Sequence, residues 1–252
     1  MAEQQTSHAD EIVRVDGLYK KYSKKADWAV ENVSFSVNQG EIVGLLGHNG
    51  AGKSTTLRCL EGMLPFDQGS ISICGYDIVK SPLKAKANMG FVTDDHSVFV
   101  KMTGLQYIDF MADIYKVSSA LRKERFAELE SVFCLGDSVC NLIASYSHGM
   151  RQKICMMGSL IHMPRLWILD EPMTGLDPRT MRAVQIFMLD YAKKGNGILF
   201  SSHALSTVAK LCDRVVLIRK GKQVSDINVR EITEKDSQFD FEEYFLNHER
   251  QD

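Results

Sequence analysis

Apolar residues occur in short runs through the first hundred positions and again after position 164. Some runs alternate with polar residues, which predicts strands with one buried face, and others are almost wholly apolar, which predicts fully buried strands. Glycines between the runs predict turns, which separate one strand from the next. The two patterns together predict strands at residues 11–15, 33–37, 41–46, 69–75, 89–93, 166–170, 197–201, 215–218 and 222–224.

Between about residues 103 and 163 the apolar positions recur every three or four residues, which is the spacing of a helix. This block has few strand signals, so we expect it to be an insertion into an α/β core. Strands that alternate with helices favour a mostly parallel sheet that holds ligands at its carboxyl edge. The predicted helices are 55–61, 105–115, 121–133, 148–162 and 180–192.

Composition narrows the class of protein without deciding its function. With 252 residues, 44% of them hydrophobic, the chain can form one large α/β domain or two small ones. A formal net charge of −2 provides no overall basic field that would attract nucleic acid. Residues 1–10 predict a flexible polar tail and not a targeting segment. No apolar stretch is long enough to span a bilayer, so we expect a chain that is soluble by itself.

The cysteines favour a reducing compartment, and the methionines favour a role in the core. The six cysteines form no C-x-x-C pair, which argues against a zinc site and for a cytosolic location. Of the twelve methionines, four lie between residues 150 and 163, where we expect them to fill the core.

One glycine-rich loop carries the clearest chemistry. It follows the strand at 41–46, precedes a helix and matches G-x-x-x-x-G-K-[ST] at every fixed position. Its backbone N–H groups can hold phosphate oxygens, and the helix that follows points its positive end at the same anion. The lysine would reach the terminal phosphates and the serine hydroxyl would bind magnesium. We therefore predict a nucleoside triphosphate site at Gly47, His48, Asn49, Gly50, Ala51, Gly52, Lys53, Ser54 and Thr55.

Two carboxylates end the apolar strand at 166–170. Asp170 is placed to hold magnesium, directly or through water, as a phosphate-loop enzyme requires. Glu171, one residue further, could act as the general base for an attacking water. A buried strand with a polar end would give the same pattern, but the phosphate-binding loop in the same chain favours the functional interpretation.

The phosphate-binding loop, the Asp170-Glu171 pair, the segment 175–177 (Gly-Leu-Asp) and His203 after the next strand together resemble the ATP-binding subunit of an ABC transporter. The resemblance covers about residues 11–225.

This resemblance implies a P-loop NTPase fold. It would have a mostly parallel sheet core, a small antiparallel β lobe near the N-terminus and an inserted helical subdomain at about 95–164. Residues 226–252 would form an acidic and aromatic C-terminal extension. Its aromatic cluster at 239–246 is expected to pack back on the domain, with docking of a partner as the alternative.

Two motifs depart from the family's pattern. Where the family has Leu-Ser-Gly-Gly-Gln, this chain has Tyr-Ser-His-Gly-Met at 146–150, a form similar to that of ABC-2-type exporter ATPases. By resemblance, Ser147, His148 and Gly149 would bind the terminal phosphate of an ATP held by another protomer; taken alone, the segment could be only a helix cap. The second departure is Asp94, where the family usually places a metal-contacting glutamine. It could bind magnesium through its oxygens or be only a surface acid.

Three further roles follow from the resemblance. His203 matches the histidine that bonds the terminal phosphate and orients the attacking water, although a lone histidine is more often structural. Asp177 matches the residue that communicates across the dimer. Tyr22, in a basic and aromatic loop at 19–25, matches the aromatic that stacks on adenine, and its neighbour Tyr19 could compete for that role.

The implied mechanism uses ATP and Mg²⁺. Two copies, or one copy and a homologous ATPase subunit, would sandwich two ATP molecules, and hydrolysis at Glu171 would release the dimer. Its motion would drive a separate transmembrane permease, docked through the helical subdomain near Asp94. The chain would lie at the inner face of the cell membrane, and the variant motif favours export.

Two alternatives stay open from the sequence. The chain could be a soluble ABC-type ATPase that acts on a cytosolic scaffold, or a regulatory nucleotide-binding module with weak hydrolysis. The transported substrate is not encoded in this chain, because its path would lie in the permease.

Overall fold

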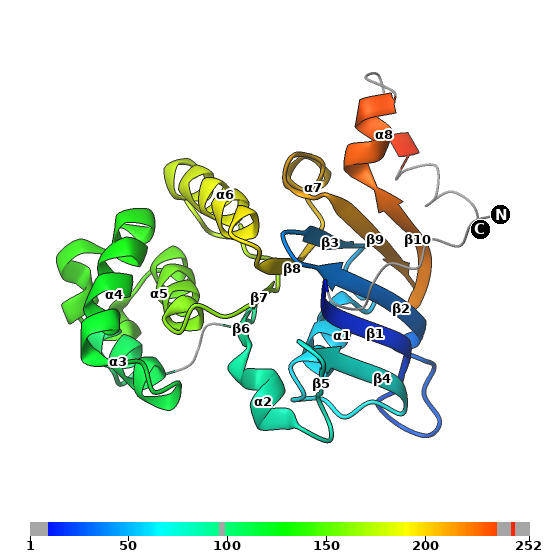
Figure 1. Ribbon diagram of the computed structural model, residues 1–252, viewed down its shortest axis with the longest axis horizontal. Helices are drawn as coiled ribbons and strands as arrows, with labels where there is room; N and C mark the ends of the chain where they lie inside the picture. Colours follow the sequence, from blue (N-terminus) through cyan, green and yellow to red (C-terminus); the bar gives the residue numbers. More distant parts are fainter. Residues whose placement is uncertain (1–9, 96–98, 236–242, 245–252) are drawn as a thin grey trace.

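A ten-stranded mixed sheet runs through the computed structural model, which describes residues 10–95, 99–235 and 243–244 (Figure 1). The strands lie in the order β5-β4-β1-β2-β10-β9-β3-β8-β7-β6. Their bounds are β1 (Glu11–Lys20), β2 (Val30–Asn38), β3 (Ile42–Leu46), β4 (Gln68–Ile73), β5 (Tyr76–Asp77), β6 (Met89–Val92), β7 (Leu166–Leu169), β8 (Gly197–Ser202), β9 (Arg214–Arg219) and β10 (Lys222–Asn228).

Helices connect most of these strands. None of those in the described ranges is both long and apolar enough to cross a membrane. They are α1 (Lys53–Leu60), α2 (Pro82–Ala87), α3 (Gly104–Ile114), α4 (Ser119–Phe133), α5 (His148–Leu160), α6 (Pro178–Lys193), α7 (Leu205–Leu211) and α8 (Val229–Lys235), with short 3₁₀ turns at Gly136–Cys140 and Ile143–Ser145.

One half of the sheet is parallel and the other contains an antiparallel lobe, as the resemblance implies. Strands β9, β3, β8, β7 and β6 pair in parallel, so their carboxyl ends meet along one edge. Strands β1, β2, β4 and β5 pair antiparallel. The predicted hairpin of β9 and β10 also forms, around Lys220 and Gly221.

The parallel strands bury both faces because their side chains alternate. In β8, for example, Ile198 and Phe200 join one hydrophobic core and Leu199 joins the other. Helix α1 contributes to the second core, which the antiparallel lobe closes, whereas α5, α6 and α7 contribute to the first. Met156 and Met157 of α5 are buried in this first core, as predicted.

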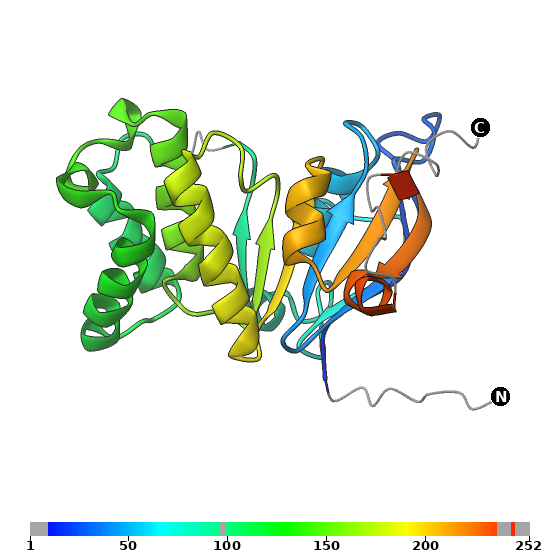
Figure 2. The same ribbon diagram turned by 90° about the horizontal axis from the view of Figure 1, so that it is seen from above.

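The helices α3, α4 and α5 form the predicted insertion between β6 and β7. In Figure 1, α5 lies between α4 and the strands β6 and β7. Figure 2, seen from above, shows α6 in front of α5. Helices α3 and α5 approach closely at Gly158. A Cβ at this position would collide with the Tyr107 ring of α3, so glycine permits the contact. Thr103 starts α3 with a capping box, in which Thr103 and Gln106 satisfy each other's backbone N–H groups.

Several boundaries differ from the sequence prediction. β1 continues to Lys20, so Tyr19 and Lys20 lie in a strand and not in a loop; pairing of Tyr19 with Gln68 extends it. Helix α1 begins at Lys53 and not at residue 55. The short elements α2, α7 and β5 were not predicted, since α2 and α7 bury only one and two residues and so lack an apolar period.

Two predicted terminal features lie largely outside the described residues. Of the predicted tail at 1–10, only residue 10 is described, and of the aromatic cluster at 239–246, only residues 243–244. Their predicted roles stay predictions.

A histidine joins the helical block to the sheet. His162 stacks on Tyr115, which follows α3, with ring centroids 3.5 Å apart. Its Nε2 lies 3.1 Å from the Met89 carbonyl oxygen, so this nitrogen carries the proton and donates it. Nδ1 is buried without a hydrogen-bond partner. Burial lowers the pKa of His162 to about 4, because protonation of Nδ1 would bury an unpaired donor and a charge.

We expect this histidine to make the fold less stable in acid. The unfolded chain takes up a proton near pH 6.5 and the folded chain only near pH 4, so stability is lost as pH falls through that window. At 1.36 kcal/mol per pKa unit, the loss is roughly 3 kcal/mol. Urea unfolding at pH 7 and pH 4.5 should show a larger drop for the wild type than for His162→Phe. Equal drops would contradict the assignment.

Candidate functional site

The phosphate-binding loop joins β3 to α1 and is shaped by its glycines. Gly50 and Gly52 have positive φ angles of 80° and 109°, which side chains rarely adopt. A Cβ at Gly52 would lie 2.5 Å from the Ala29 carbonyl oxygen, and one at Gly47 would collide with the Ile218 carbonyl. Glycine is therefore required at positions 47 and 52, because any side chain there would collide with a neighbouring backbone carbonyl.

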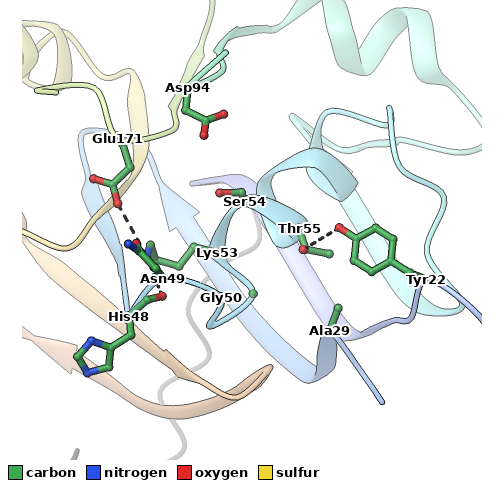
Figure 3. A pocket seen from close by; sticks show the side chains of 11 residues that line it. Tyr22, Ala29, His48, Asn49, Gly50, Lys53, Ser54, Thr55, Asp94 and Glu171 are labelled. Carbon is green, nitrogen blue, oxygen red and sulfur yellow. Dashed lines mark hydrogen bonds and ion pairs between the residues drawn. The ribbon is translucent and has the colours of Figure 1, made fainter. Parts of the chain in front are cut away.

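A pocket of about 400 Å³ opens over the loop (Figure 3). Two predicted loop residues do not line it: Gly47 turns its carbonyl to Lys53, and Ala51 is buried in the core. The lining residues are Tyr22, Ala29, His48, Asn49, Gly50, Gly52, Lys53, Ser54, Thr55, Asp94 and Glu171. The structure thus brings the predicted loop, Tyr22, Asp94 and Glu171 together around one cavity.

Lys53 is a buried cation at the floor of this pocket, only 6% exposed. Its Nζ donates to the Gly47 carbonyl at 2.6 Å and the His48 carbonyl at 3.2 Å, and lies 3.8 Å from Glu171 Oε1. Burial lowers the pKa of Lys53, and the nearby carboxylates of Glu171 and Asp170 oppose that shift. An anion that enters the pocket would therefore meet a poorly solvated positive charge.

One serine organises the two carboxylates at the end of β7. The parallel pairing of β7 with β8 places Ser201 beside them. Its Oγ donates to Asp170 Oδ1 at 2.5 Å and accepts from the Glu171 N–H at 2.9 Å. Glu171 has a φ of 48°, an unfavourable left-handed conformation for a residue with a Cβ. Ser201 thus fixes both Asp170 and the strained backbone that aims Glu171 at the pocket.

The donor set suits a magnesium ion bound together with phosphates. Asp170 is 1% exposed, and its Oδ2 is buried without a hydrogen-bond partner. Burial raises the pKa of Asp170, whereas the hydroxyls of Ser201 and Ser54 lower it. In the described part of the chain, no three His, Cys, Asp or Glu residues could hold a metal by themselves. Magnesium accepts such a sparse set, since it usually takes one or two carboxylates plus phosphates and water.

Glu171 is held between Lys53 and His203. Its Oε1 faces Lys53, and its Oε2 lies 3.0 Å from Nδ1 of His203. His203 follows β8 and is 62% exposed in its side chain, so it is free to turn toward a ligand. The predicted general base is therefore in direct contact with the histidine that is predicted to orient the attacking water.

Tyr22 and not Tyr19 lies at the pocket. The Tyr22 ring is 63% exposed and its hydroxyl is 3.0 Å from the Thr55 hydroxyl. Tyr19 instead packs edge-on against Trp28, with centroids 5.2 Å apart, and does not line the pocket. Of the two candidates, only Tyr22 presents a ring face beside the phosphate-binding loop.

The variant segment at 146–150 starts α5 and does not line this pocket. Ser147 caps the helix by accepting the Met150 N–H at 3.2 Å, so the structural role is present. A Cβ at Gly149 would lie 2.6 Å from the Gly175 carbonyl oxygen, and the His148 ring packs directly on Gly175. His148 and Gly149 are therefore packed against Gly175, and none of Ser147, His148 and Gly149 lines the nucleotide pocket of their own chain.

The chain is similar in sequence to proteins of one known family. A family model described as ABC transporter matches residues 30–174, more than half of the chain. The chain belongs to the ABC transporter family. The linearmycin resistance ATP-binding protein LnrL of Bacillus subtilis is 33% identical over 214 residues, which is 85% of this chain and 68% of LnrL. The ABC transporter ATP-binding protein NatA of the same organism is 35% identical over 202 residues, 80% of this chain and 82% of NatA.

Further relatives agree in sequence and in fold. The doxorubicin resistance ATP-binding protein DrrA of Mycobacterium tuberculosis is 33% identical over 223 residues, covering 88% of this chain and 67% of DrrA. A solved ATP-binding subunit of an ABC transporter superposes with a TM-score of 0.88 at 29% identity, covering 95% of this chain and 100% of the other. This chain is an ATP-binding subunit of an ABC transporter, and it is an ATPase.

In this ABC ATPase, Asp177 caps α6. Its carboxylate accepts from the backbone N–H of Thr180 at 2.9 Å and from its hydroxyl at 2.7 Å, and lies 3.5 Å from Lys153 Nζ. These hydrogen bonds lower the pKa of Asp177 to about 2. The residue thus links α6 to α5, and its predicted role in communication across a dimer stays a prediction.

Two residues important for the site of this ABC ATPase were not singled out from the sequence. Ser201 was assigned only to a strand, although a serine at the end of an apolar run was a usable signal. Gln152 is 1% exposed and its Nε2 donates to the Pro172 carbonyl at 3.0 Å. It ties the start of α5 to the turn after Glu171; a polar residue on the buried face of a predicted helix was the signal.

Replacing Ser201 with Ala should slow ATP hydrolysis without unfolding the chain. Asp170 would lose its donor and the Glu171 N–H its acceptor, so we expect turnover to fall about tenfold or more, in line with losses at outer-shell partners of metal ligands. Steady-state phosphate release checks this, with thermal unfolding to confirm the fold. Ser72→Ala in β4 is the matched control. Unchanged turnover in Ser201→Ala would contradict the positioning role.

Proposed function

We propose that this chain binds ATP with Mg²⁺ in the pocket over the phosphate-binding loop, dimerises around ATP and powers a separate transmembrane permease. The observation that carries the proposal is an incomplete site. Lys53, Ser54, Asp170 and Glu171 line or support one side of the pocket, while nothing from the α5 segment of the same chain covers it.

Each group of the pocket has a role toward the nucleotide. Tyr22 stacks on the base, because its exposed ring offers an apolar face. The backbone N–H groups of the loop and the start of α1 hold the phosphates, and Lys53 neutralises the terminal ones. Ser54 and Asp170 would hold magnesium, and Asp94, which lines the same pocket, could add an oxygen ligand. The ion, when bound, supplies positive charge to the phosphate oxygens.

Glu171 acts as general base. As Lys53 turns to phosphate, Glu171 Oε1 becomes available to take the proton of a water that attacks the terminal phosphorus. His203, already 3.0 Å from Glu171, orients that water and bonds the terminal phosphate. The contact between the two side chains supports this division of roles.

A second protomer completes the site. Ser147, His148 and Gly149 stand at the N-terminus of α5, where the direction of the backbone N–H groups and the helix dipole favour an anion. Each protomer's segment would bind the terminal phosphate held by the other's loop. Gly175 lies against this segment, and Asp177 is linked to the same helix through Lys153, so the two residues would respond to ATP bound across the dimer. The partner is a second copy or a homologous ATPase subunit.

The permease would dock on the helical block near Asp94, at the inner face of the cell membrane. We assign residues 11–225 to the nucleotide-binding domain, about 95–164 to its helical subdomain and 226–252 to an extension. Relatives named for linearmycin and doxorubicin resistance support export.

We expect Glu171→Gln to bind ATP, to hydrolyse it at least about a hundredfold more slowly and to accumulate a dimer, because the amide cannot take a proton. Gel filtration with ATP and Mg²⁺ measures the dimer, and phosphate release measures turnover. Glu128→Gln, on the exposed face of α4, is the matched control. Full turnover with no dimer would show that Glu171 is not the base.

We expect Lys53→Ala to lose ATP binding, because it removes the buried cation from the pocket floor. Isothermal titration calorimetry with ATP should detect no binding, or an affinity weakened by at least about a hundredfold, the equivalent of roughly 3 kcal/mol. Lys193→Ala on α6 serves as the control, since that lysine pairs with Asp190 on the surface. An unchanged ATP affinity would overturn the nucleotide site.

A further inference from the structure

Asp94 has a cationic partner on the helix that carries the metal-binding serine. Asp94 Oδ1 lies 3.8 Å from a terminal nitrogen of Arg58 and accepts from the Thr93 hydroxyl at 3.3 Å. Arg58 stands one turn after Ser54 on α1, so the two residues share a helix face. Figure 3 places Asp94 on the side of the pocket that also holds Ser54 and Glu171.

Asp94 adds a third carboxylate to this side of the pocket. Its charge, like that of Glu171, raises the pKa of Asp170. Lys53 interacts with two of these acids, Glu171 and Asp170, and Arg58 supplies a cation for the third, Asp94. The pair is about half exposed on both sides, so its attraction is modest and a divalent ion can compete with it.

Arg58 also has a second acceptor within reach. Glu61 follows three residues later on the same helix, at the spacing that brings side chains together. Its Oε2 is buried without a hydrogen-bond partner. Burial raises the pKa of Glu61, while the charges of Lys86 and Arg58 lower it, so Arg58 already acts on this carboxylate. Arg58 therefore interacts with two acids, Asp94 at the pocket and Glu61 at the C-terminal end of α1.

We propose that Arg58 and Asp94 form a metal-responsive pair: without Mg²⁺ the guanidinium holds Asp94, and with Mg²⁺ Asp94 turns to the ion while Arg58 moves to Glu61. This inference rests on the proposed Mg²⁺ and ATP site. Arg58 is a positioning residue, which acts through Asp94 and sets the metal affinity of the site by competing for its carboxylate.

The test measures metal binding and not turnover. Mn²⁺ is titrated into the full chain with an excess of a non-hydrolysable ATP analogue, and the free ion is followed by electron paramagnetic resonance. Arg58→Gln should tighten Mn²⁺ binding about threefold or more, because a competing cation is removed. Asp94→Asn should weaken it about tenfold. The double variant should match Asp94→Asn, since Arg58 has no carboxylate left to hold. Lys193→Gln is the control for lost surface charge.

The outcomes separate this inference from the proposed function. A wild-type chain that binds no nucleotide would overturn both. Normal nucleotide binding with Mn²⁺ affinity unchanged or weakened in Arg58→Gln would overturn the pair alone. The same tightening by Arg58→Gln in the wild-type and Asp94→Asn backgrounds would also overturn it, because the effect would then not act through Asp94.

Discussion

The site depends on one hydroxyl placed between two parallel strands. Ser201 of β8 donates to Asp170 and accepts from the N–H of Glu171, so it fixes the two carboxylates in one step. The register of β7 against β8 decides this contact, since a shift of one residue would turn Ser201 to the opposite face. Burial of the parallel strands on both faces holds that register. Packing of the two hydrophobic cores thus fixes the alignment of β7 and β8, and this alignment places Ser201 against the two carboxylates.

Charge balance is the second constraint on the site. Lys53 is almost wholly buried and is balanced by Glu171, whose other oxygen contacts His203. Each of these contacts can be exchanged for a contact with phosphate or water. Asp94 and Arg58 repeat this arrangement at the edge of the pocket. Nucleotide and metal would therefore enter by replacing ion pairs within the protein, and no uncompensated charge need form.

The sequence was most informative where a feature is local. Short, almost wholly apolar runs predicted strands of the parallel core, and the loop pattern predicted the pocket floor around Lys53. Asp170 and Glu171 followed from their place at the end of an apolar run. Short elements such as α2 were not predicted, because they bury too few residues to produce a periodic pattern of apolar positions.

Contacts that depend on packing could not be predicted from the sequence. Ser201 reaches Asp170 only through the pairing of β7 and β8, and Gln152 reaches Pro172 only once α5 has docked on the sheet. The choice of Tyr22 over Tyr19 needed the full length of β1, which carries Tyr19 against Trp28. The ion pair of Arg58 with Asp94 joins α1 to the end of β6 in the same way.

The central claim is that the α5 segment of one protomer completes the pocket of another. A photoreactive ATP, derivatised on its terminal phosphate, tests this in a mixture of two chains. One chain is wild type, and the other is a size-tagged Lys53→Ala chain with its Ser147 segment intact. If the site is shared, residues near Ser147 of the tagged chain are labelled only when the wild-type chain is present. Label confined to the wild-type chain would contradict it.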